Sequence, residues 1–213
     1  SIVGIDIYDV TGNRLMTENG QIALQYAYGD GEKKSAWLMK NAVSNLMYGV
    51  PISSSIAMSI DGISTVNDLM GGVEITVPKD YTYVDPVFEQ GKTLTLTGEQ
   101  AEKYVRYRDI TVTGSNSDRM ERQTQFVMAL MSQLKQASQK DTELYAKLMT
   151  GTNPYFTTDM SADEIMALST YEMDGEIQTI PGEERAGAEH DEFYTNEDEL
   201  QKMVVKTFYK IKD

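Results

Sequence analysis

The chain has 213 residues, 40% of them hydrophobic and 24% charged, which is ordinary for one globular domain, and no stretch approaches the roughly 18 apolar residues of a membrane span. A formal net charge of -14 repels nucleic-acid phosphates and therefore argues against DNA or RNA as a partner. The chain has no cysteine, so disulfides, thiolate catalysis and cysteine-ligated zinc are excluded.

The first elements follow from periodicity and turn residues. Residues 4–15 alternate apolar and polar side chains around the Thr-Gly-Asn turn at 11–13, which predicts strand structure interrupted by a tight turn. A short helix is expected within residues 21–34. Apolar side chains at helical spacing then predict an amphipathic helix over residues 34–49, with Gly49 as its stop.

Strands and helices continue to alternate along the rest of the chain. The patterns predict strands at 53–60, 73–78, 92–97, 176–181 and 192–195, and helices at 62–70, 98–107, 119–139, 142–149, 161–168 and 197–210. Capping signatures are Thr97 with Gln100, Asp118 with Glu121, and the single N-caps Asp61, Ser161 and Asn196. We predict an α/β fold, a three-layer α/β/α sandwich around a central mixed β-sheet, with residues 1–213 as a single domain.

Four arginines gather within residues 104–126 although the chain is acidic. Arg119, Arg122 and Gln123 share one face at the start of the predicted long helix, because they are three and four residues apart. Cations at a helix N-terminus are unfavourable unless an anion offsets them. Phosphate suits this position, since a guanidinium group matches its oxygens with two parallel hydrogen bonds.

Arg106 and Arg108 join this group only if the preceding helix ends near Tyr107. A phosphate site formed by all four arginines is one interpretation. The alternative is a set of solvated ion pairs, because arginines among carboxylates commonly form such pairs. The neighbouring carboxylates are Glu99, Glu102, Asp109, Asp118 and Glu121.

The same stretch resembles the LytR-CpsA-Psr family of bacterial cell-envelope glycopolymer ligases, whose pattern is Arg-x-Arg, a short loop, and Arg-x-x-Arg-Gln opening a helix. The matching residues are Arg106, Arg108, Arg119, Arg122 and Gln123. Residues 48–78 and 94–108 resemble two further motifs of that family. The likeness extends over roughly residues 20–213.

The resemblance implies an enzyme that binds an undecaprenyl-type pyrophosphate and transfers the linked glycopolymer, of teichoic acid or capsule type, to a peptidoglycan hydroxyl with the help of Mg²⁺. The implied catalytic residues are Arg106, Arg108 and Arg119, and the implied substrate-binding residues are these three with Arg122 and Gln123. The implied location is the extracytoplasmic face of the bacterial membrane. We expect the first strands, the family's Arg-Asp pair, the metal ligands and an N-terminal membrane anchor to lie upstream of residue 1.

A second hypothesis is a non-catalytic module that binds polyprenyl phosphate or regulates the cell envelope. Two positions favour it, because Gln21 and Ala57 stand where the family often has basic residues. The family's Pro-Arg-Asp motif at the end of an early strand is also missing from these 213 residues. Each missing cation weakens the attraction for a pyrophosphate in a partly desolvated pocket.

Overall fold

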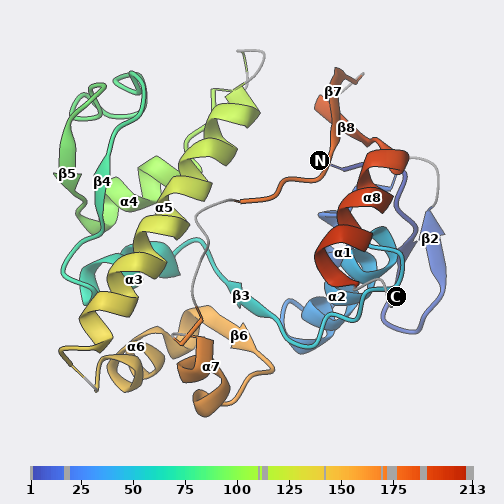
Figure 1. Cartoon of the computed structure of the whole chain (residues 1–213), viewed down its shortest axis with the longest axis horizontal. Helices are drawn as coiled ribbons and strands as arrows, with labels where there is room; N and C mark the ends of the chain where they lie inside the picture. The colour runs from blue at the N-terminus through green and yellow to red at the C-terminus, as the bar shows by residue number, and fades with distance from the viewer. Residues whose placement is uncertain are drawn as a thin grey trace. The chain divides into compact units, whose positions relative to one another are not determined.

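The structure, a computed structural model, describes residues 2–16, 20–109, 111, 115–141, 143–168, 170–171, 177–187 and 191–209 (Figure 1). Contacts group the chain into two compact units. The first unit comprises Ser1–Ala57, Thr157–Met160 and Tyr171–Asp213, and the second comprises Met58–Phe156 and Ser161–Thr170. The single domain predicted over residues 1–213 stays a prediction, because contact density alone does not define an independently folding domain.

The first unit begins with a hairpin and two helices. Its elements are β1 (Ile7–Tyr8), β2 (Arg14–Met16), α1 (Leu24–Ala27) and α2 (Lys33–Leu46). The predicted turn is confirmed: the Asp9 carboxylate accepts hydrogen bonds from the backbone N–H of Thr11 at 2.8 Å and of Asn13 at 2.9 Å. β1 and β2 are antiparallel, and both helices lie where the sequence predicted them.

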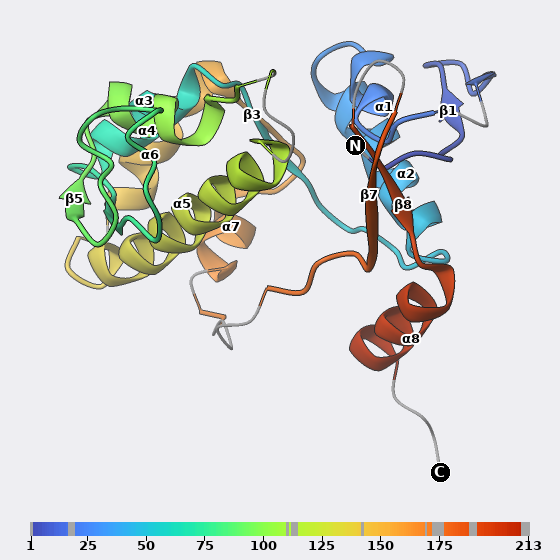
Figure 2. The ribbon, with the colours of Figure 1, turned by 90° about the horizontal axis from the view of Figure 1, so that it is seen from above.

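A second hairpin and a helix complete the first unit. β7 (Gly182–Ala186) pairs antiparallel with β8 (Asp191–Thr195), and α8 (Glu197–Phe208) follows; Figure 2 shows the twisted ribbon leading into that helix. Asn196 caps α8 as predicted, because its side chain accepts from the Glu199 N–H at 3.2 Å. α8 contributes Leu200 and Val204 to the small core of this unit.

The strand predicted at 176–181 is wrong: residues 177–181 form no strand, and residue 176 lies outside the described residues. The structure instead has a strand, β7, that begins at Gly182, in a segment whose sequence is typical of a charged loop. All five residues of β7 are exposed, so no apolar alternation marks it. Its pairing comes from backbone hydrogen bonds to β8, which do not depend on side-chain type.

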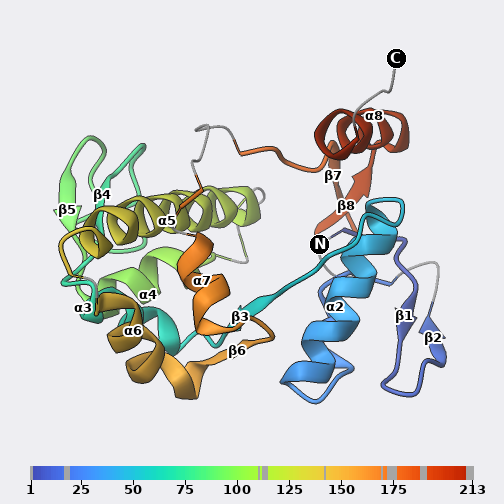
Figure 3. The ribbon, with the colours of Figure 1, turned by 60° about the horizontal axis from the view of Figure 1, so that its bottom comes forward.

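The second unit is mainly helical. Its elements include α3 (Gly62–Leu69), β4 (Glu74–Thr76), β5 (Thr93–Thr95), α4 (Gly98–Arg106), α5 (Ser115–Ser138), α6 (Leu144–Thr152), the 3-10 helix η1 (Asn153–Tyr155) and α7 (Ala162–Leu168). β3 (Ile56–Met58) pairs with β6 (Phe156–Thr158), a strand that the sequence did not predict, and most residues of these two strands belong to the first unit. Figure 3 shows the long helix α5 passing over α4 and beside β4, and it contacts both.

The core of the second unit gathers side chains from α3, β4, α4, α5 and the segments next to β4 and β5. Its buried members are Ile63, Val73, Ile75, Val77, Tyr81, Phe88, Leu96, Ala101, Tyr104 and Phe126. The predicted capping box that opens α4 is confirmed, since Thr97 accepts from the Gln100 N–H and Gln100 accepts from the Thr97 N–H at 3.0 Å. This core and this cap together fix the direction in which α4 ends.

Two predicted caps are wrong. Asp61 precedes α3, but its side chain makes no capping hydrogen bond, because its own backbone is already helical. α5 begins at Ser115, so Asp118 lies inside the first turn instead of before it. The Asp118 carboxylate binds the Lys79 ammonium at 2.7 Å, which is a contact between distant segments that spacing along the helix does not reveal.

The α/β class is confirmed, with helices and strands interspersed along the chain. The described strands pair two by two in four two-stranded sheets. Within the described residues, the predicted central mixed sheet is therefore divided into these four pairs of strands. The strands are short, from two residues in β1 to five in β7 and β8, which leaves few backbone groups for a third neighbour. None of the described helices is both long and apolar enough to cross a membrane.

Candidate anion-binding site

The position at which α4 ends determines the directions of the Arg106 and Arg108 side chains. α4 ends at Arg106, and Tyr107 leaves the helix with φ -57° and ψ 133°, which confirms the predicted end near Tyr107. Arg108 is thereby directed to the start of α5, where its Nε donates to the Ser115 Oγ at 3.4 Å. Arg106 stays on the surface of α4 in an ion pair with Glu102 at 2.9 Å.

Arg119 lies near the start of α5 in a partly desolvated place. One of its terminal nitrogens donates to the Asn116 Oδ1 at 2.8 Å, but its Nε is buried and has no hydrogen-bond partner among the described residues. Burial lowers the pKa of the Arg119 guanidinium, and the positive charges of Arg108 and Arg122 lower this pKa further. The Arg119 guanidinium therefore lies in the positive field of Arg108 and Arg122, and an anion would relieve this repulsion.

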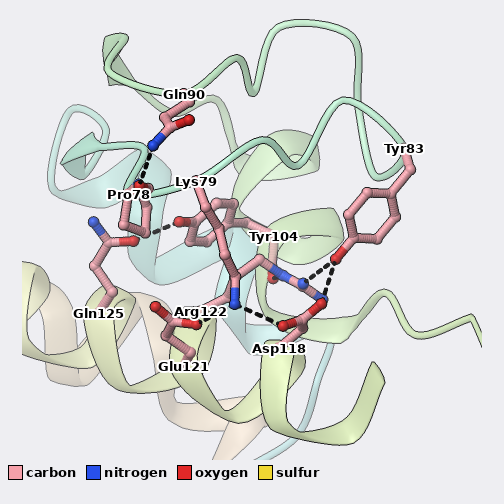
Figure 4. Close-up of polar contacts among 9 residues, drawn as sticks. All are labelled: Pro78, Lys79, Tyr83, Gln90, Tyr104, Asp118, Glu121, Arg122 and Gln125. Atoms are coloured by element: carbon pink, nitrogen blue, oxygen red, sulfur yellow. Dashed lines mark hydrogen bonds and ion pairs between the residues drawn. The ribbon is translucent and has the colours of Figure 1, made fainter. Parts of the chain in front are cut away.

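Arg122 is almost completely buried, with 1% of its surface exposed. Its Nε donates to the Tyr104 carbonyl at 2.7 Å, one terminal nitrogen donates to the Tyr107 carbonyl, and the other donates to the Tyr83 hydroxyl at 3.2 Å. The guanidinium carbon lies 4.9 Å from the centre of the Tyr81 ring. Figure 4 shows this side chain enclosed between the loop that bears Tyr83 and the end of α4.

Gln123 makes a contact of the same kind, because its Nε2 donates to the Val105 carbonyl at 3.1 Å. The last carbonyls of a helix have no partner within the helix, and cations are favourable near that end. Arg122 and Gln123 together satisfy three such carbonyls at the end of α4. Their observed role is thus to fasten the end of α4 to the side of α5.

The five predicted residues therefore occupy different places. Arg108, Arg119 and Arg122 lie near one another, Gln123 holds the end of α4, and Arg106 pairs with Glu102 on the helix surface. Solvated ion pairing, the alternative interpretation, describes Arg106 but not Arg119. Binding of phosphate by these residues stays a prediction.

A polar network that the sequence did not predict lies beside the arginines. The Lys79 ammonium is 2.7 Å from both the Asp118 and the Glu121 carboxylates, and the Tyr83 hydroxyl donates to Asp118 at 3.3 Å (Figure 4). The hydrogen bond from Lys79 lowers the pKa of Asp118, and burial raises the pKa of Tyr83. The signal available in the sequence was the alternation of Lys79, Tyr81 and Tyr83 in a segment that otherwise reads as a loop.

The described residues do not form an evident magnesium site. No group of three or more His, Cys, Asp or Glu side chains gathers among them. Two carboxylates of this region are already engaged, because Asp109 accepts from the Thr111 N–H at 2.9 Å and Asp118 binds Lys79. The Mg²⁺ ion that the resemblance implies stays a prediction.

Comparison with known proteins gives one curated relative of named activity. It is the polyisoprenyl-teichoic acid--peptidoglycan teichoic acid transferase TagU of Halalkalibacterium halodurans, 29% identical over 115 residues, which cover 54% of this chain and 36% of that protein. The chain thus spans about a third of the length of this curated relative.

Several solved structures share the fold. TagU of B. subtilis superposes with a TM-score of 0.68 at 18% identity, covering 98% of this chain and 84% of that chain. Lin1025 of Listeria innocua gives 0.66 at 23% identity, covering 88% and 77%. TagT bound to LI-WTA gives 0.67 at 20% identity, covering 97% and 75%. The family model described as the LytR_cpsA_psr family matches residues 3–208, and with nearly the whole chain matched, this chain belongs to the LytR-CpsA-Psr family.

Proposed function

We propose that this chain is part of a phosphotransferase that moves a glycopolymer from a polyprenyl pyrophosphate to peptidoglycan. Membership of the family and the named activity of the TagU relative support the proposal. The observation that carries it is the buried Nε of Arg119, which lacks a hydrogen-bond partner among the described residues and lies near Arg108 and Arg122. An anion with several oxygens is the ligand that such a group of donors fits best.

In this proposal a peptidoglycan hydroxyl attacks the phosphorus that carries the glycopolymer. The P–O bond between the two phosphates breaks, the glycopolymer phosphate joins the hydroxyl oxygen, the hydroxyl proton is released, and polyprenyl phosphate leaves. Arg108 and Arg119 donate to the phosphate oxygens, on which negative charge is spread during the transfer. Arg122 and Gln123 hold the end of α4, so that Arg108 points toward α5.

Arg106 contributes by exchanging its present partner for the substrate. Its side chain is 61% exposed, and its ion pair with Glu102 is an exposed pair of the kind worth at most about 1 kcal/mol. The pyrophosphate carries two negative charges on neighbouring phosphates, and its oxygens accept two parallel hydrogen bonds from one guanidinium group. Arg106 is therefore the third arginine expected to contact the pyrophosphate.

The proposed glycopolymer is teichoic acid, and the proposed location is the cell envelope. The name of the TagU relative favours teichoic acid as the glycopolymer over a capsule polymer. We place this reaction at the extracytoplasmic face of the cell membrane, which is the location that the family resemblance implies. Mg²⁺ would offset part of the pyrophosphate charge.

The test uses a polyprenyl pyrophosphate in the presence of Mg²⁺, with water in place of the acceptor hydroxyl. Water attacks the terminal phosphorus, the bond between the two phosphates breaks, and the released inorganic phosphate is the readout. We expect turnover by the wild type and a loss of at least about tenfold in Arg108→Ala and in Arg119→Ala, because each removes a charged donor. The matched control is Arg185→Ala, which removes an exposed arginine of β7 in the first unit. Turnover of both site variants at the wild-type rate would refute the assignment.

The second candidate is a module that binds polyprenyl phosphate without transferring anything. It is favoured by Gln21 and Ala57, two uncharged residues where the family often has cations. Calorimetry with the same pyrophosphate separates the two candidates. Binding that depends on Arg119 without any phosphate release in the presence of Mg²⁺ supports the module, whereas release supports the transferase.

A further inference from the structure

A cavity in the first unit lies between the β1–β2 hairpin and α2, and its volume is about 270 Å³. This is close to the lower end of the range of small-molecule sites, about 300–1,000 Å³. Polar and aromatic side chains dominate its wall. The ones that matter here are Asp6, Tyr8, Trp37, Asn41, Ser44 and Asn45.

One face of α2 supplies most of this wall. Trp37, Asn41 and Asn45 are successive i, i+4 positions, so their side chains stand above one another on the helix. Leu38 and Ala42, also at the cavity, are buried and give it an apolar base. The arrangement is an aromatic ring followed along the helix by two amides, beside an apolar floor.

The opposite wall is held in place by a buried glutamine. Gln25 of α1 is 1% exposed, and its amide makes two hydrogen bonds to the backbone of Tyr8, accepting from the N–H at 3.0 Å and donating to the carbonyl at 2.7 Å. The Tyr8 hydroxyl in turn donates to the Asp6 carboxylate at 3.4 Å. The hairpin wall is therefore fixed against α1 by contacts that involve no ligand.

Several exposed or half-buried groups at the cavity have no hydrogen-bond partner in the part of the chain that the structure describes. The side chains of Asn41, Ser44 and Asn45 make no hydrogen bond to any other residue that the structure describes. Trp37 is 46% exposed, and the Lys34 ammonium lies 4.3 Å from the centre of its ring. A lysine on an exposed ring is a weak contact that a ligand can exchange.

We propose that this cavity binds a neutral carbohydrate, with one pyranose ring stacked on Trp37. The C–H face of a pyranose is apolar and flat enough to cover an indole, while its hydroxyls both donate and accept hydrogen bonds. Amides such as those of Asn41 and Asn45 do the same, and the Asp6 carboxylate accepts. A phosphorylated polymer is disfavoured by the net charge of -14 on the chain, and the Asp6 carboxylate in the wall already pairs with the Arg14 guanidinium at 3.6 Å.

Two sources of such a sugar exist for a protein of the cell envelope: the glycan strand of peptidoglycan and an uncharged sugar of another glycopolymer. They share the stacking and hydroxyl chemistry and differ in the acetamido group. The site is defined without reference to the arginines of the second unit. Failure of the proposed phosphotransfer would therefore leave the sugar site unaffected, and failure of the sugar site would leave the phosphotransfer unaffected.

Trp37 is the single tryptophan of the chain, so its fluorescence reports on this cavity directly. We expect a saturable fluorescence change on titration with chitotriose or with cellotriose, which lacks the acetamido groups. Tighter binding of chitotriose identifies the peptidoglycan-type sugar, and equal binding identifies a general neutral-sugar site. Both results support the proposal, whereas no saturable change with either oligosaccharide overturns it.

Asn41→Ala and Asn45→Ala are each expected to weaken binding about three- to tenfold, the loss for one net hydrogen bond. Alanine has the higher helix propensity, so these variants should keep α2 folded, which far-UV circular dichroism checks. Gln201→Ala is the matched control, an exposed amide of α8 outside the cavity, and it should bind as the wild type does. Unchanged affinity in both asparagine variants also overturns the proposal.

Two further variants complete the test. Trp37→Ala should abolish binding as measured by calorimetry, which does not depend on the fluorophore. Arg119→Ala should keep the sugar affinity of the wild type, because the cavity contains no residue of the second unit. Loss of sugar binding in Arg119→Ala would contradict a separate site, while loss of phosphate release alone concerns the proposed function only.

Discussion

Replacement of the buried arginine Arg122 by methionine tests whether this residue fastens α4 to α5. Methionine is unbranched and apolar, so it fills much of the space of the arginine stem without its donors. The variant leaves the Tyr104 and Tyr107 carbonyls and the Tyr83 hydroxyl without the partner seen in the structure. It also removes the contact of the guanidinium with the Tyr81 ring.

The magnitude follows from the groups left behind. A buried acceptor without a partner costs about 1–3 kcal/mol, and two carbonyls lose a charged donor. Removing a guanidinium that is itself desolvated offsets part of this cost. We expect the free energy of unfolding of the protein to fall by about 3 kcal/mol.

Two other arginines provide matched controls. Arg106→Met breaks one exposed ion pair at i, i+4 and should cost no more than about 0.5 kcal/mol. Arg119→Met should stay within about 1 kcal/mol of the wild type. The pKa of Arg119 is lowered in the fold, so the folded state holds this proton less tightly than the unfolded chain does, and the charge does not stabilise the fold at neutral pH.

The assay is urea unfolding followed by far-UV circular dichroism. It is combined with hydrogen exchange at the end of α4, since Trp37 lies in the first unit and does not report on the second. Faster exchange at the amides of residues 104–108 in Arg122→Met would locate the loss. A free energy of unfolding within about 1 kcal/mol of that of Arg106→Met would refute this role of Arg122.

Three further variants probe the contacts around this frame. Lys79→Met removes the hydrogen bond that lowers the pKa of Asp118 below 3.8. In the wild type, the stabilisation by Asp118 is present above pH 3.8 and is lost as the pH falls through the lowered pKa. The pH midpoint of acid unfolding should therefore rise in the variant, and an unchanged midpoint contradicts the pairing. Tyr83→Phe removes the hydroxyl that accepts from Arg122 and should cost about 1 kcal/mol in urea unfolding, with no change as the contrary result. Asn196→Ala removes the cap of α8 and should lower the free energy of unfolding by about 1 kcal/mol. Unfolding is followed by the fluorescence of Trp37, and a stability equal to that of the wild type would show that the cap is dispensable.

The division of roles among the arginines bears on how variants of this motif are interpreted. Loss of activity in an Arg122 variant would follow from a displaced end of α4 as readily as from a lost ligand, because Arg122 holds the Tyr104 and Tyr107 carbonyls and the Tyr83 hydroxyl. Arg119 differs, since its Nε has no partner among the described residues. Activity and stability therefore have to be measured on the same variants.

The sequence by itself determined the features that depend on neighbours a few residues away. The capping box of Thr97 and Gln100, the helix over most of residues 34–49 and the end of α4 near Tyr107 were all predictable, because caps and periodicity act within one or two helical turns. The family motif belongs to the same class, since it is a pattern of spacing. These features placed Arg106, Arg108, Arg119 and Arg122 near the junction of two helices.

Only the tertiary structure decided what each arginine does there. Arg119 and Arg122 lie three residues apart in α5 and are equivalent by spacing, yet Arg122 is buried against a tyrosine 39 residues earlier in the chain while the Arg119 Nε finds no partner among the described residues. The bond between Lys79 and Asp118 spans the same separation of 39 residues, and β7 becomes a strand only because β8 pairs with it. Such contacts depend on which segments packing brings together, and no local pattern records that choice.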